Sequence, residues 1–310
     1  MTASPRALPH RSPAVAGVRR RSTRRWLVGA LFLAPALLLH LCVVGIPALV
    51  TFGLALTNWD GLKAPQFVGL ANFVEIFTRD DVFARAFTNN LRWLGVFLTL
   101  PVMLGLVAAI LTSGVGRIQL LYRTVYFLPY IFPAAVVARM FNYLYHPFYG
   151  VNRIFKQVGL NALVHPWLGD PNIVLYAVLF ASFWHFWGFD FLVFLSALQQ
   201  IDRALYECAA TEGANRFEVF RYITLPLLRP TLVFILLITT LWSFNAFDYV
   251  YIMTQGGPAH ASEVMATWIY GAAVADRRAG YASALAVMLT LISSGVIGAY
   301  IYLRRKGLEA

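Results

Sequence analysis

The chain has 310 residues, of which 59% are hydrophobic and only 13% are charged, and its formal net charge is +11. Soluble domains carry about 25% charged residues, so this chain has too little polar surface to cover a soluble globule of its length. The composition excludes a separate soluble enzyme domain and predicts one helical membrane domain.

The first 25 residues form a basic segment with seven arginines and no acid. Such a segment is typical of a nucleic-acid contact or of the cytoplasmic end of a membrane protein, and the long apolar runs that follow favour the second. We therefore expect residues 1–25 to be a disordered cytoplasmic tail, with no nucleic-acid partner. A secretory signal peptide has an apolar region of about 7–15 residues, whereas this one runs from Trp26 to about Leu56. It is therefore interpreted as a retained first span.

Six apolar segments are long enough to cross a bilayer. About 20 residues are needed, because roughly 30 Å of hydrocarbon is crossed at 1.5 Å per residue. In lipid only a helix satisfies the backbone of such a segment, so residues 26–305 are predicted to form an all-α transmembrane domain. The first segment is over-long and contains Pro35 and Pro47, which favour a kink or a tilt. The six predicted spans are 27–56, 91–111, 124–145, 173–198, 231–253 and 281–303.

Lysine and arginine indicate the orientation, because cytoplasmic loops carry an excess of them. With the N-terminus inside, sixteen of the 25 basic residues fall in cytoplasmic segments and eight in external ones, with Arg92 at the outer edge of the second span counted as external. The remaining one, Arg139, lies within a span. We therefore predict a multi-pass protein with both termini in the cytoplasm.

The segment between the fourth and fifth spans, residues 199–230, is a cytoplasmic loop of unusual length. Loops between bundle helices usually have about 2–8 residues. This one carries the signals of a helix–turn–helix: Asp202 can cap a first helix, which has apolar residues at i, i+3 and i+4. Gly213 is expected to provide the left-handed or close-packed position that ends this helix.

A second helix is predicted after this turn. Asn215 can cap it, and Glu218 three residues later completes a capping box. Pro226 is expected to end the helix, and Pro230 suits the first turn of the following span. The loop would then be a stiff two-helix unit.

An amphipathic helix lying on the lipid surface is the alternative for this loop. It would carry mainly basic residues on its polar face, but residues 201–230 hold four basic and four acidic residues. Small residues at positions 209, 210, 213 and 214 favour close docking into a cleft of another protein.

The loop resembles the corresponding loop of ABC-importer permeases, above all those of the carbohydrate-uptake group. That group includes the larger membrane subunit of the maltose transporter and permeases for sugars and glycerol phosphate. The resemblance is carried by Glu207-Cys-Ala-Ala-Thr-Glu-Gly-Ala214, then Phe220, Leu225-Pro226 and Arg229-Pro230. Cys208 and Glu212 depart mildly from the usual alanine and aspartate. Further similar segments, over about residues 27–305, are 67–73, 123–129, 149–152, 187–189 and 254–258.

The resemblance implies that this coupling loop sits in a cleft of a cytoplasmic ATPase and transmits its movement to the spans. It also implies a second, homologous permease subunit, an ATPase dimer, an external solute-binding protein, a sugar-like substrate and the bacterial inner membrane. The sequence has no glycine-rich phosphate loop, so we expect ATP to bind the ATPase partners, and this chain to have no cofactor, metal site or enzymatic activity. The residues implied for coupling are Glu207, Ala210, Gly213, Ala214, Phe220 and Pro226.

Ionisable side chains inside spans are functional candidates, and Arg139, Asp190 and Asp248 are of this kind, with structural pairing as an equal alternative. Sugars are held by aromatic faces and a few amides or carboxylates. Asn245 and Asp248, one turn apart, are the stronger candidates, whereas single aromatics can simply pack and His185 is predicted as a structural contact. The residues implied for the substrate pathway by the resemblance are Trp184, Trp187, Gly188, Phe191, Phe244, Asn245 and Asp248.

A stand-alone carrier or channel and an integral-membrane enzyme are the competing interpretations. A carrier would need a complete solute path in one chain, and an enzyme would need a cluster of His, Asp or Glu at a membrane face. The sequence has neither signal, and neither interpretation explains the loop 199–230. We therefore predict the permease subunit of an ATP-driven importer.

Overall fold

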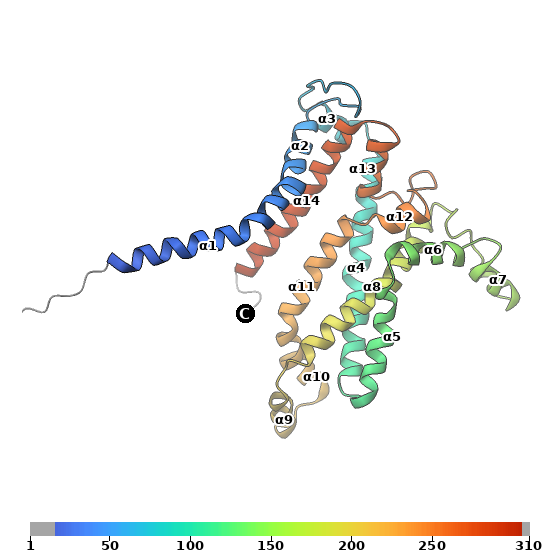
Figure 1. Ribbon diagram of the computed structural model, residues 1–310. Coiled ribbons are helices and arrows are strands. Elements are labelled where there is room, and N and C mark those ends of the chain that lie inside the picture. The colour runs from blue at the N-terminus through green and yellow to red at the C-terminus, as the bar shows by residue number, and fades with distance from the viewer. Residues whose placement is uncertain (1–15, 306–310) are drawn as a thin grey trace, which may run out of the picture. The chain divides into compact units, whose positions relative to one another are not determined.

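The computed structural model describes residues 16–305 as helices joined by loops, with no strand among these residues (Figure 1). The predicted all-α class is confirmed. Five of the described helices are long and apolar enough to cross a membrane, or six if one bent helix pair counts as a single span. The chain divides into two units, residues 1–51 and 52–310, and each is described by itself.

The first unit contains α1 (Ala16–His40), a five-residue π-helical turn, η1 (Leu41–Gly45), and most of α2 (Ile46–Leu54). Pro47 is the second residue of α2, two positions after the end of this turn. In a regular helix a proline ring collides with a carbonyl oxygen of the preceding turn, and the wider π spacing relieves that collision. The first predicted span is therefore helical on both sides of Pro47.

The predicted tail, residues 1–25, is described only from residue 16 onward. Residues 16–25 form the first turns of α1, where the sequence predicted no regular structure. Residues 1–15 lie outside the described part of the chain.

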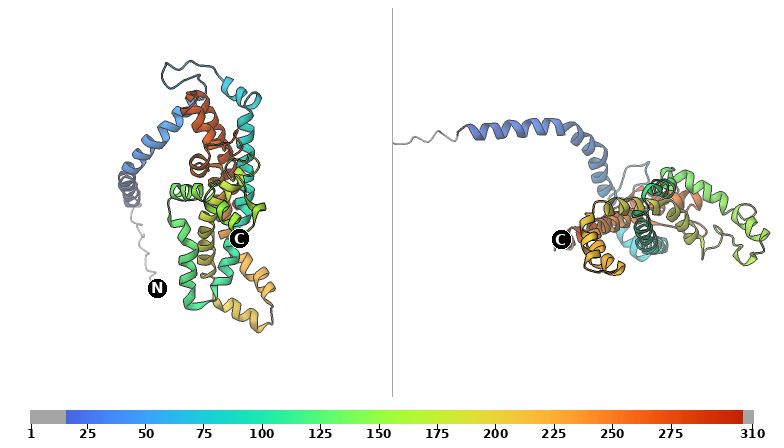
Figure 2. Two further views of the ribbon diagram at one scale, coloured as in Figure 1. Left: turned by 90° about the vertical axis from the view of Figure 1, so that its right-hand side faces the viewer. Right: turned by 90° about the horizontal axis from the view of Figure 1, so that it is seen from below.

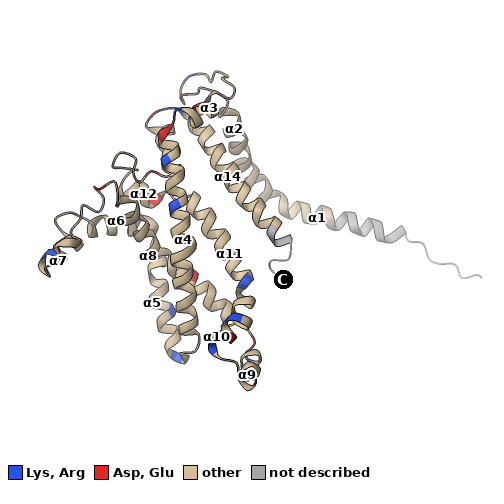
Figure 3. Ribbon diagram, turned by 180° about the vertical axis from the view of Figure 1, so that it is seen from behind, with Lys and Arg blue, Asp and Glu red and all other residues tan. Residues whose placement is uncertain are grey.

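The second unit contains the remaining helices. The longest, α4, has 33 residues and would measure about 50 Å at 1.5 Å per residue, so it extends beyond a hydrocarbon layer of about 30 Å. Charged residues of the second unit lie mainly near the ends of the long helices (Figure 3). The elements are α3 (Ala71–Thr78), α4 (Asp81–Ser113), η2 (Gly116–Ile118), α5 (Gln119–Ile131), α6 (Ala134–Leu144), α7 (Gly150–Gln157), η3 (Asn161–Leu163), α8 (Val174–Leu198), α9 (Arg203–Thr211), α10 (Arg216–Val219), η4 (Phe220–Thr224), α11 (Leu225–Phe244), α12 (Asp248–Met253), α13 (Met265–Val274) and α14 (Ala279–Arg305).

The two ends of this unit carry different elements. α3 and the start of α14 lie at one end, and α9 and α10 lie at the other (Figures 1 and 2). At the first end the Asp80 carboxylate accepts hydrogen bonds from Nε1 of Trp268 in α13 (2.8 Å) and from the Tyr281 hydroxyl in α14. An ion pair joins Arg278 to Glu75 of α3 (2.7 Å). These contacts connect α3 and the start of α4 to α13 and α14, and we call this end of the unit the rim.

The third predicted span, residues 124–145, is not one helix. α5 ends at Ile131, α6 begins at Ala134, and the two helices are bent by 88° to each other. Pro133 has no backbone N–H and favours an extended residue before it, and Phe132 is extended (φ −73°, ψ 144°). The prediction of a continuous helix was wrong because hydropathy does not register this backbone break.

Close helix packing depends on two glycines. A Cβ atom on Gly105 of α4 would lie 2.7 Å from the backbone nitrogen of Phe191 in α8. A Cβ atom on Gly188 of α8 would lie 2.0 Å from the carbonyl oxygen of Tyr126 in α5. Neither position has room for a side chain, so these glycines set the separation of α8 from α4 and from α5.

The segment after the fourth span forms the helices α9 and α10, but Pro226 does not end the second of them. The π-helical turn η4 connects α10 to α11, so the helix that begins at Arg216 continues into the fifth span. Pro226 lies in the first turn of α11 and Pro230 in its interior. A proline at a first turn lacks only an N–H that has no helical partner anyway, so it can follow the π turn without ending the helix.

Candidate functional site

A cavity of about 310 Å³ lies where α4, α6, α8, α11 and α12 meet. Aromatic rings form most of its wall, and they are Trp93, Phe97, Phe186, Trp242, Phe247 and Tyr249. The polar side chains of the lining are Ser182, Ser243, Asn245 and Asp248. Among the described residues no lysine or arginine borders this cavity, so Asp248 supplies its one formal charge.

The polar end of the cavity is a break between α11 and α12. α11 ends at Phe244 and α12 begins at Asp248, so the helix is interrupted within the fifth predicted span, residues 231–253, although Arg216–Met253 as a whole is one candidate membrane span. The Asn245 side-chain amide donates to the carbonyl oxygen of Leu241 (2.8 Å), which closes the last turn of α11. The break exposes Asn245 and Asp248 to the cavity from two different helix ends.

Asn90 of α4 holds this break in place. Its Nδ2 donates to the carbonyl oxygen of Ser243 at the end of α11 (2.6 Å), and its Oδ1 accepts from the backbone N–H of Met265 at the start of α13 (2.8 Å). Helix ends leave such backbone groups without intrahelical partners. The fully buried Asn90 amide satisfies one group at each of two helix ends.

His185 of α8 connects the two helix breaks of the unit. Its Nε2 lies 2.9 Å from the carbonyl oxygen of Phe132, at the break between α5 and α6, and its Nδ1 lies 2.7 Å from the hydroxyl of Tyr249 in α12. Because a carbonyl oxygen only accepts, Nε2 of the neutral ring carries the proton and Nδ1 accepts from Tyr249. The Tyr130 ring stacks on the imidazole at 5.6 Å. His185 is therefore a structural contact, as predicted.

The substrate-pathway residues implied by the resemblance fall into two groups. Asn245 and Asp248 line the cavity. Phe191 and Phe244 are buried in helix packing, and Gly188 faces the backbone of α5. The remaining two residues of the set are tryptophans, and they also pack against other rings: Trp184 contacts Phe141 and Trp187 contacts Tyr126.

The three intramembrane charges predicted as candidates also separate. Asp248 lines the cavity, Asp190 is buried at the contact of α8 with α4, and Arg139 is exposed on α6. The structure therefore does not bring these three groups together.

Sequence reasoning did not select the residues of α4 that form and support the cavity. Trp93 and Phe97 line it, and Asn90 fixes its polar end. The pair Asn89-Asn90 beside an apolar run was the available signal, because amides at the edge of a span need hydrogen-bond partners.

The turn between α9 and α10 is fixed by its own residues. Gly213 adopts a left-handed conformation (φ +79°), and nothing lies within 4 Å of where its Cβ atom would be. Asn215 Oδ1 accepts from the N–H of Glu218 (3.0 Å), while Glu218 Oε2 accepts from the N–H of Asn215 (2.7 Å). This is the capping box that the sequence predicted.

The α9–α10 unit is also attached to the start of the next helix. The Tyr206 hydroxyl of α9 lies 3.2 Å from the Thr224 hydroxyl of η4. Glu207, Ala210 and Gly213 are exposed, and the remaining coupling candidates, Ala214, Phe220 and Pro226, are half-buried. The large side chains of Phe217 and Tyr222 are 71% and 74% exposed.

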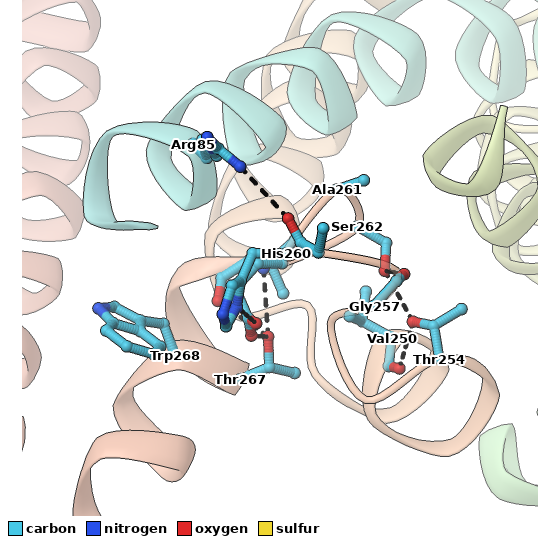
Figure 4. Close-up of polar contacts among 12 residues, drawn as sticks. Arg85, Val250, Thr254, Gly257, His260, Ala261, Ser262, Thr267 and Trp268 are labelled. Atoms are coloured by element: carbon cyan, nitrogen blue, oxygen red, sulfur yellow. Dashed lines mark hydrogen bonds and ion pairs between the residues drawn. The ribbon is translucent and has the colours of Figure 1, made fainter. Parts of the chain in front are cut away.

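The loop between α12 and α13 is held rigidly at the opposite end of the unit (Figure 4). The Ser262 hydroxyl bonds to Thr254 Oγ1 (2.7 Å) and to the carbonyl oxygen of Gly257 (2.7 Å). The buried Glu263 carboxylate is held by His260 Nδ1 (2.8 Å) and by the Thr267 hydroxyl (2.5 Å). This loop therefore presents a fixed surface.

Comparison with known proteins identifies the family. Residues 101–306 match the family described as "Binding-protein-dependent transport system inner membrane component". The chain belongs to this family. Together with its apolar helices, this makes the chain a multi-pass inner-membrane protein and a transporter component.

Individual family members cover nearly the whole chain. The "Probable ABC transporter permease protein YurN" of Bacillus subtilis (strain 168) is 35% identical over 86% of this chain and 92% of its own length. The sulfoquinovosyl glycerol transport system permease protein SmoG of Agrobacterium fabrum (strain C58) is 32% identical over 90% of this chain and 91% of its own.

A solved structure extends the similarity to the fold. It is a bacterial ABC transporter involved in the import of the acidic polysaccharide alginate, and the matched chain superposes with a TM-score of 0.80 at 25% identity. The match covers 93% of this chain and 98% of that one. The resemblance of the loop 199–230 to ABC-importer permeases therefore reflects family membership.

Proposed function

We propose that the chain is the permease subunit of an ABC importer and that it passes a sugar or sugar derivative delivered by an external solute-binding protein. The cavity is the observation that carries this proposal, because its aromatic walls face an amide and a carboxylate, Asn245 and Asp248. That combination suits a polyhydroxyl solute. The names of SmoG and of the alginate transporter support a carbohydrate.

The proposal includes an orientation. The α9–α10 end faces the cytoplasm, both termini are cytoplasmic, and the membrane is a bacterial inner membrane. This orientation is supported by the excess of lysine and arginine in the segments assigned to the inside. The rim of α3, α13 and α14 then faces the external side, where the binding protein delivers the solute.

Two further partners are proposed besides the binding protein. A second permease subunit shares the solute path, and a cytoplasmic ATPase dimer binds and hydrolyses ATP. This chain then binds no cofactor and catalyses no reaction. The exposed rings of Phe217 and Tyr222 support a protein contact at α9–α10, because neighbouring exposed apolar side chains outside the apolar spans can form an interaction surface.

The α9–α10 unit is suited to transmit movement. Its turn is fixed by the Asn215–Glu218 capping box, and the contact of Tyr206 with Thr224 ties α9 to the helix that leads to the cavity. A flexible loop would absorb the displacement of an ATPase, whereas a stiff one moves the helix attached to it. We assign Glu207, Ala210 and Gly213 to the exposed contact surface and Ala214, Phe220 and Pro226 to the base of the unit.

Solute contact is tested by changing the two polar groups of the cavity. Growth and labelled uptake across a carbon-source panel first identify the solute in a deletion strain. The double variant N245A/D248A is expected to lower its uptake about tenfold or more, because it removes the polar groups that orient the ligand. T240A, in the last two turns of α11 but outside the cavity lining, is the control. Unchanged uptake by the double variant would remove these residues from the solute path.

Coupling is tested at Gly213. The β-branched G213V is strained at a positive φ, whereas asparagine accepts this conformation. We expect G213V to retain membrane insertion and basal ATPase activity but to lose most uptake, and G213N to retain most of it. Normal uptake by G213V would contradict the coupling role. Transport by the purified chain alone would favour a stand-alone carrier instead.

A further inference from the structure

The outer part of α4 carries a basic groove that is separate from the solute cavity. The groove has a volume of about 320 Å³ and is lined by Arg85, Thr88, Asn89 and Arg92 of α4, together with Pro171 and His260 from two loops. It shares no lining residue with the cavity. Because α4 is longer than the hydrocarbon layer is thick, its first turns project from the membrane at the end opposite α9 and α10.

The two arginines of the groove have no anionic partner among the residues that the structure describes. Arg85 donates to the carbonyl oxygen of Ala259 (3.3 Å; Figure 4), and Arg92 donates to Oδ1 of Asn89 (3.3 Å). Both side chains are exposed, and neither forms an ion pair within residues 16–305. A guanidinium has five N–H donors, so each arginine keeps most of its donors and its full charge for another molecule.

The nearby acids, including Asp81 one turn before Arg85 on α4, form no ion pair with either arginine among the described residues. Glu263 is buried and is already bonded to His260 and Thr267. Asp170 accepts hydrogen bonds from its neighbour Asn172. No aspartate or glutamate is part of the groove lining. The groove is therefore a positively charged surface.

The groove is also rigid before anything binds. Asn89 Nδ2 donates to the carbonyl oxygens of Ala261 (2.9 Å) and Glu263 (2.8 Å), which fixes the loop between α12 and α13 to α4. The same asparagine holds Arg92. A surface that does not have to be ordered on binding loses less free energy in forming a complex.

We propose that this groove docks carboxylate side chains of the external solute-binding protein. The inference rests on the proposed function, which puts this end of α4 on the outer side. The family to which the chain belongs depends on a binding protein, so a protein surface must be recognised there. Two arginines two helical turns apart, each with spare parallel donors, match a pair of carboxylates on that protein.

The test uses the assembled transporter in lipid nanodiscs and its own purified binding protein. The dissociation constant of docking and the stimulation of ATPase activity by the binding protein are measured at low and high salt. The variant R85E/R92E is expected to weaken docking about tenfold or more at low salt and to remove most of the salt dependence. R85Q/R92Q is expected to give a smaller loss in the same direction, and it serves if charge reversal prevents assembly.

K63E is the matched control, because Lys63 is exposed but lies outside the groove lining. Equal losses in K63E and R85E/R92E would mean a general charge effect and would overturn the proposal. Unchanged docking by R85E/R92E would also overturn it. If uptake of an anionic sugar such as glucuronate changed while docking did not, the groove would contact the solute and not the binding protein. A wild-type transporter that its binding protein does not stimulate would contradict the proposed function itself.

Discussion

The α9–α10 unit and the cavity are stabilised by different kinds of contact. In the α9–α10 turn the decisive hydrogen bonds join residues two or three positions apart, as between Asn215 and Glu218. Around the cavity they join residues far apart in the chain: Asn90 bonds to Ser243, 153 positions away, and His185 bonds to Tyr249, 64 positions away. The first region is therefore specified by local sequence, and the second exists only once the helices have packed.

This difference has a functional consequence. A locally fixed turn keeps its shape whatever the rest of the molecule does, which suits a part that must transmit movement. A cavity whose two helix breaks are bonded to α4 and α8 changes shape when those helices move. Substitutions in the α9–α10 unit should accordingly change the overall stability of the protein little, whereas substitutions around the cavity should change it strongly.

The largest effect is expected for G188V. Its new side chain would collide with the carbonyl oxygen of Tyr126, since even a Cβ atom would lie 2.0 Å away. The backbone cannot move aside as a flexible side chain can, so α5 and α8 must separate. We expect this to lower the free energy of unfolding by about 3 kcal/mol. Thermal inactivation of the purified protein in detergent measures this loss.

G95A is the matched control for that experiment. Gly95 is also in a membrane helix, α4, but nothing lies within 4 Å of where its Cβ atom would be. Alanine there should be neutral or slightly stabilising, because glycine is the poorer helix former. Equal inactivation temperatures for G188V and the wild type would mean that the α5–α8 contact is not as close as described.

A smaller but still substantial effect is expected for H185A. The substitution leaves the Phe132 carbonyl and the Tyr249 hydroxyl without their partner, and an unsatisfied buried polar group costs about 2 kcal/mol. Both helix breaks beside the cavity lose their connection, so we expect lower uptake together with lower thermal stability.

Y249F separates the two halves of this connection, since it removes only the bond to Nδ1 of His185. If the imidazole joins the breaks, the double variant H185A/Y249F should lose less stability than the sum of the two single variants. Strict additivity would contradict the connection between α8 and α12.

The smallest effect is expected for N215A. It removes the cap of α10 and half of the capping box, and such a loss costs about 1 kcal/mol. Because the unit is exposed, we expect overall thermal stability to change little and local hydrogen exchange in α10 to rise. N215D and N215S, which retain a side-chain acceptor, should behave nearly as wild type. A large fall in overall stability would mean that the turn is supported by more than its local bonds.

Much of the fold could be predicted from the sequence, and the failures share a cause. Hydropathy placed the long helices because a membrane span needs a long apolar segment, and α4 and α8 lie where it predicted them. It did not detect the break at Phe132–Pro133, where the surrounding residues are as apolar as the helices, or the break after Phe244, where the two polar residues Asn245 and Asp248 are averaged out in a window of about 19 residues. Pro226 was wrongly predicted to end a helix for a related reason. A proline ends a helix only where the missing N–H breaks a hydrogen bond or the ring collides with the preceding turn, and the π turn before α11 removes both problems.

The candidate site shows the same division. Asn245 and Asp248, two of the residues implied for the substrate pathway, line the cavity, whereas Trp187, Gly188 and Phe191 pack against other helices. A sequence pattern identifies aromatic residues on a helix without telling which side of the helix meets a neighbour. That side depends on how closely α8 approaches α4 and α5.

The sequence by itself determined the helical class, the position of the long apolar helices and the geometry of the α9–α10 turn, because these depend on composition and on residues a few positions apart. Only the tertiary structure decided where the helices break, which residues enclose the cavity, and that Arg85 and Arg92 share a groove with His260. Those features rest on contacts between residues far apart in the chain, such as the bonds of Asn89 and Asn90 to the loops around α13. No local pattern encodes such contacts.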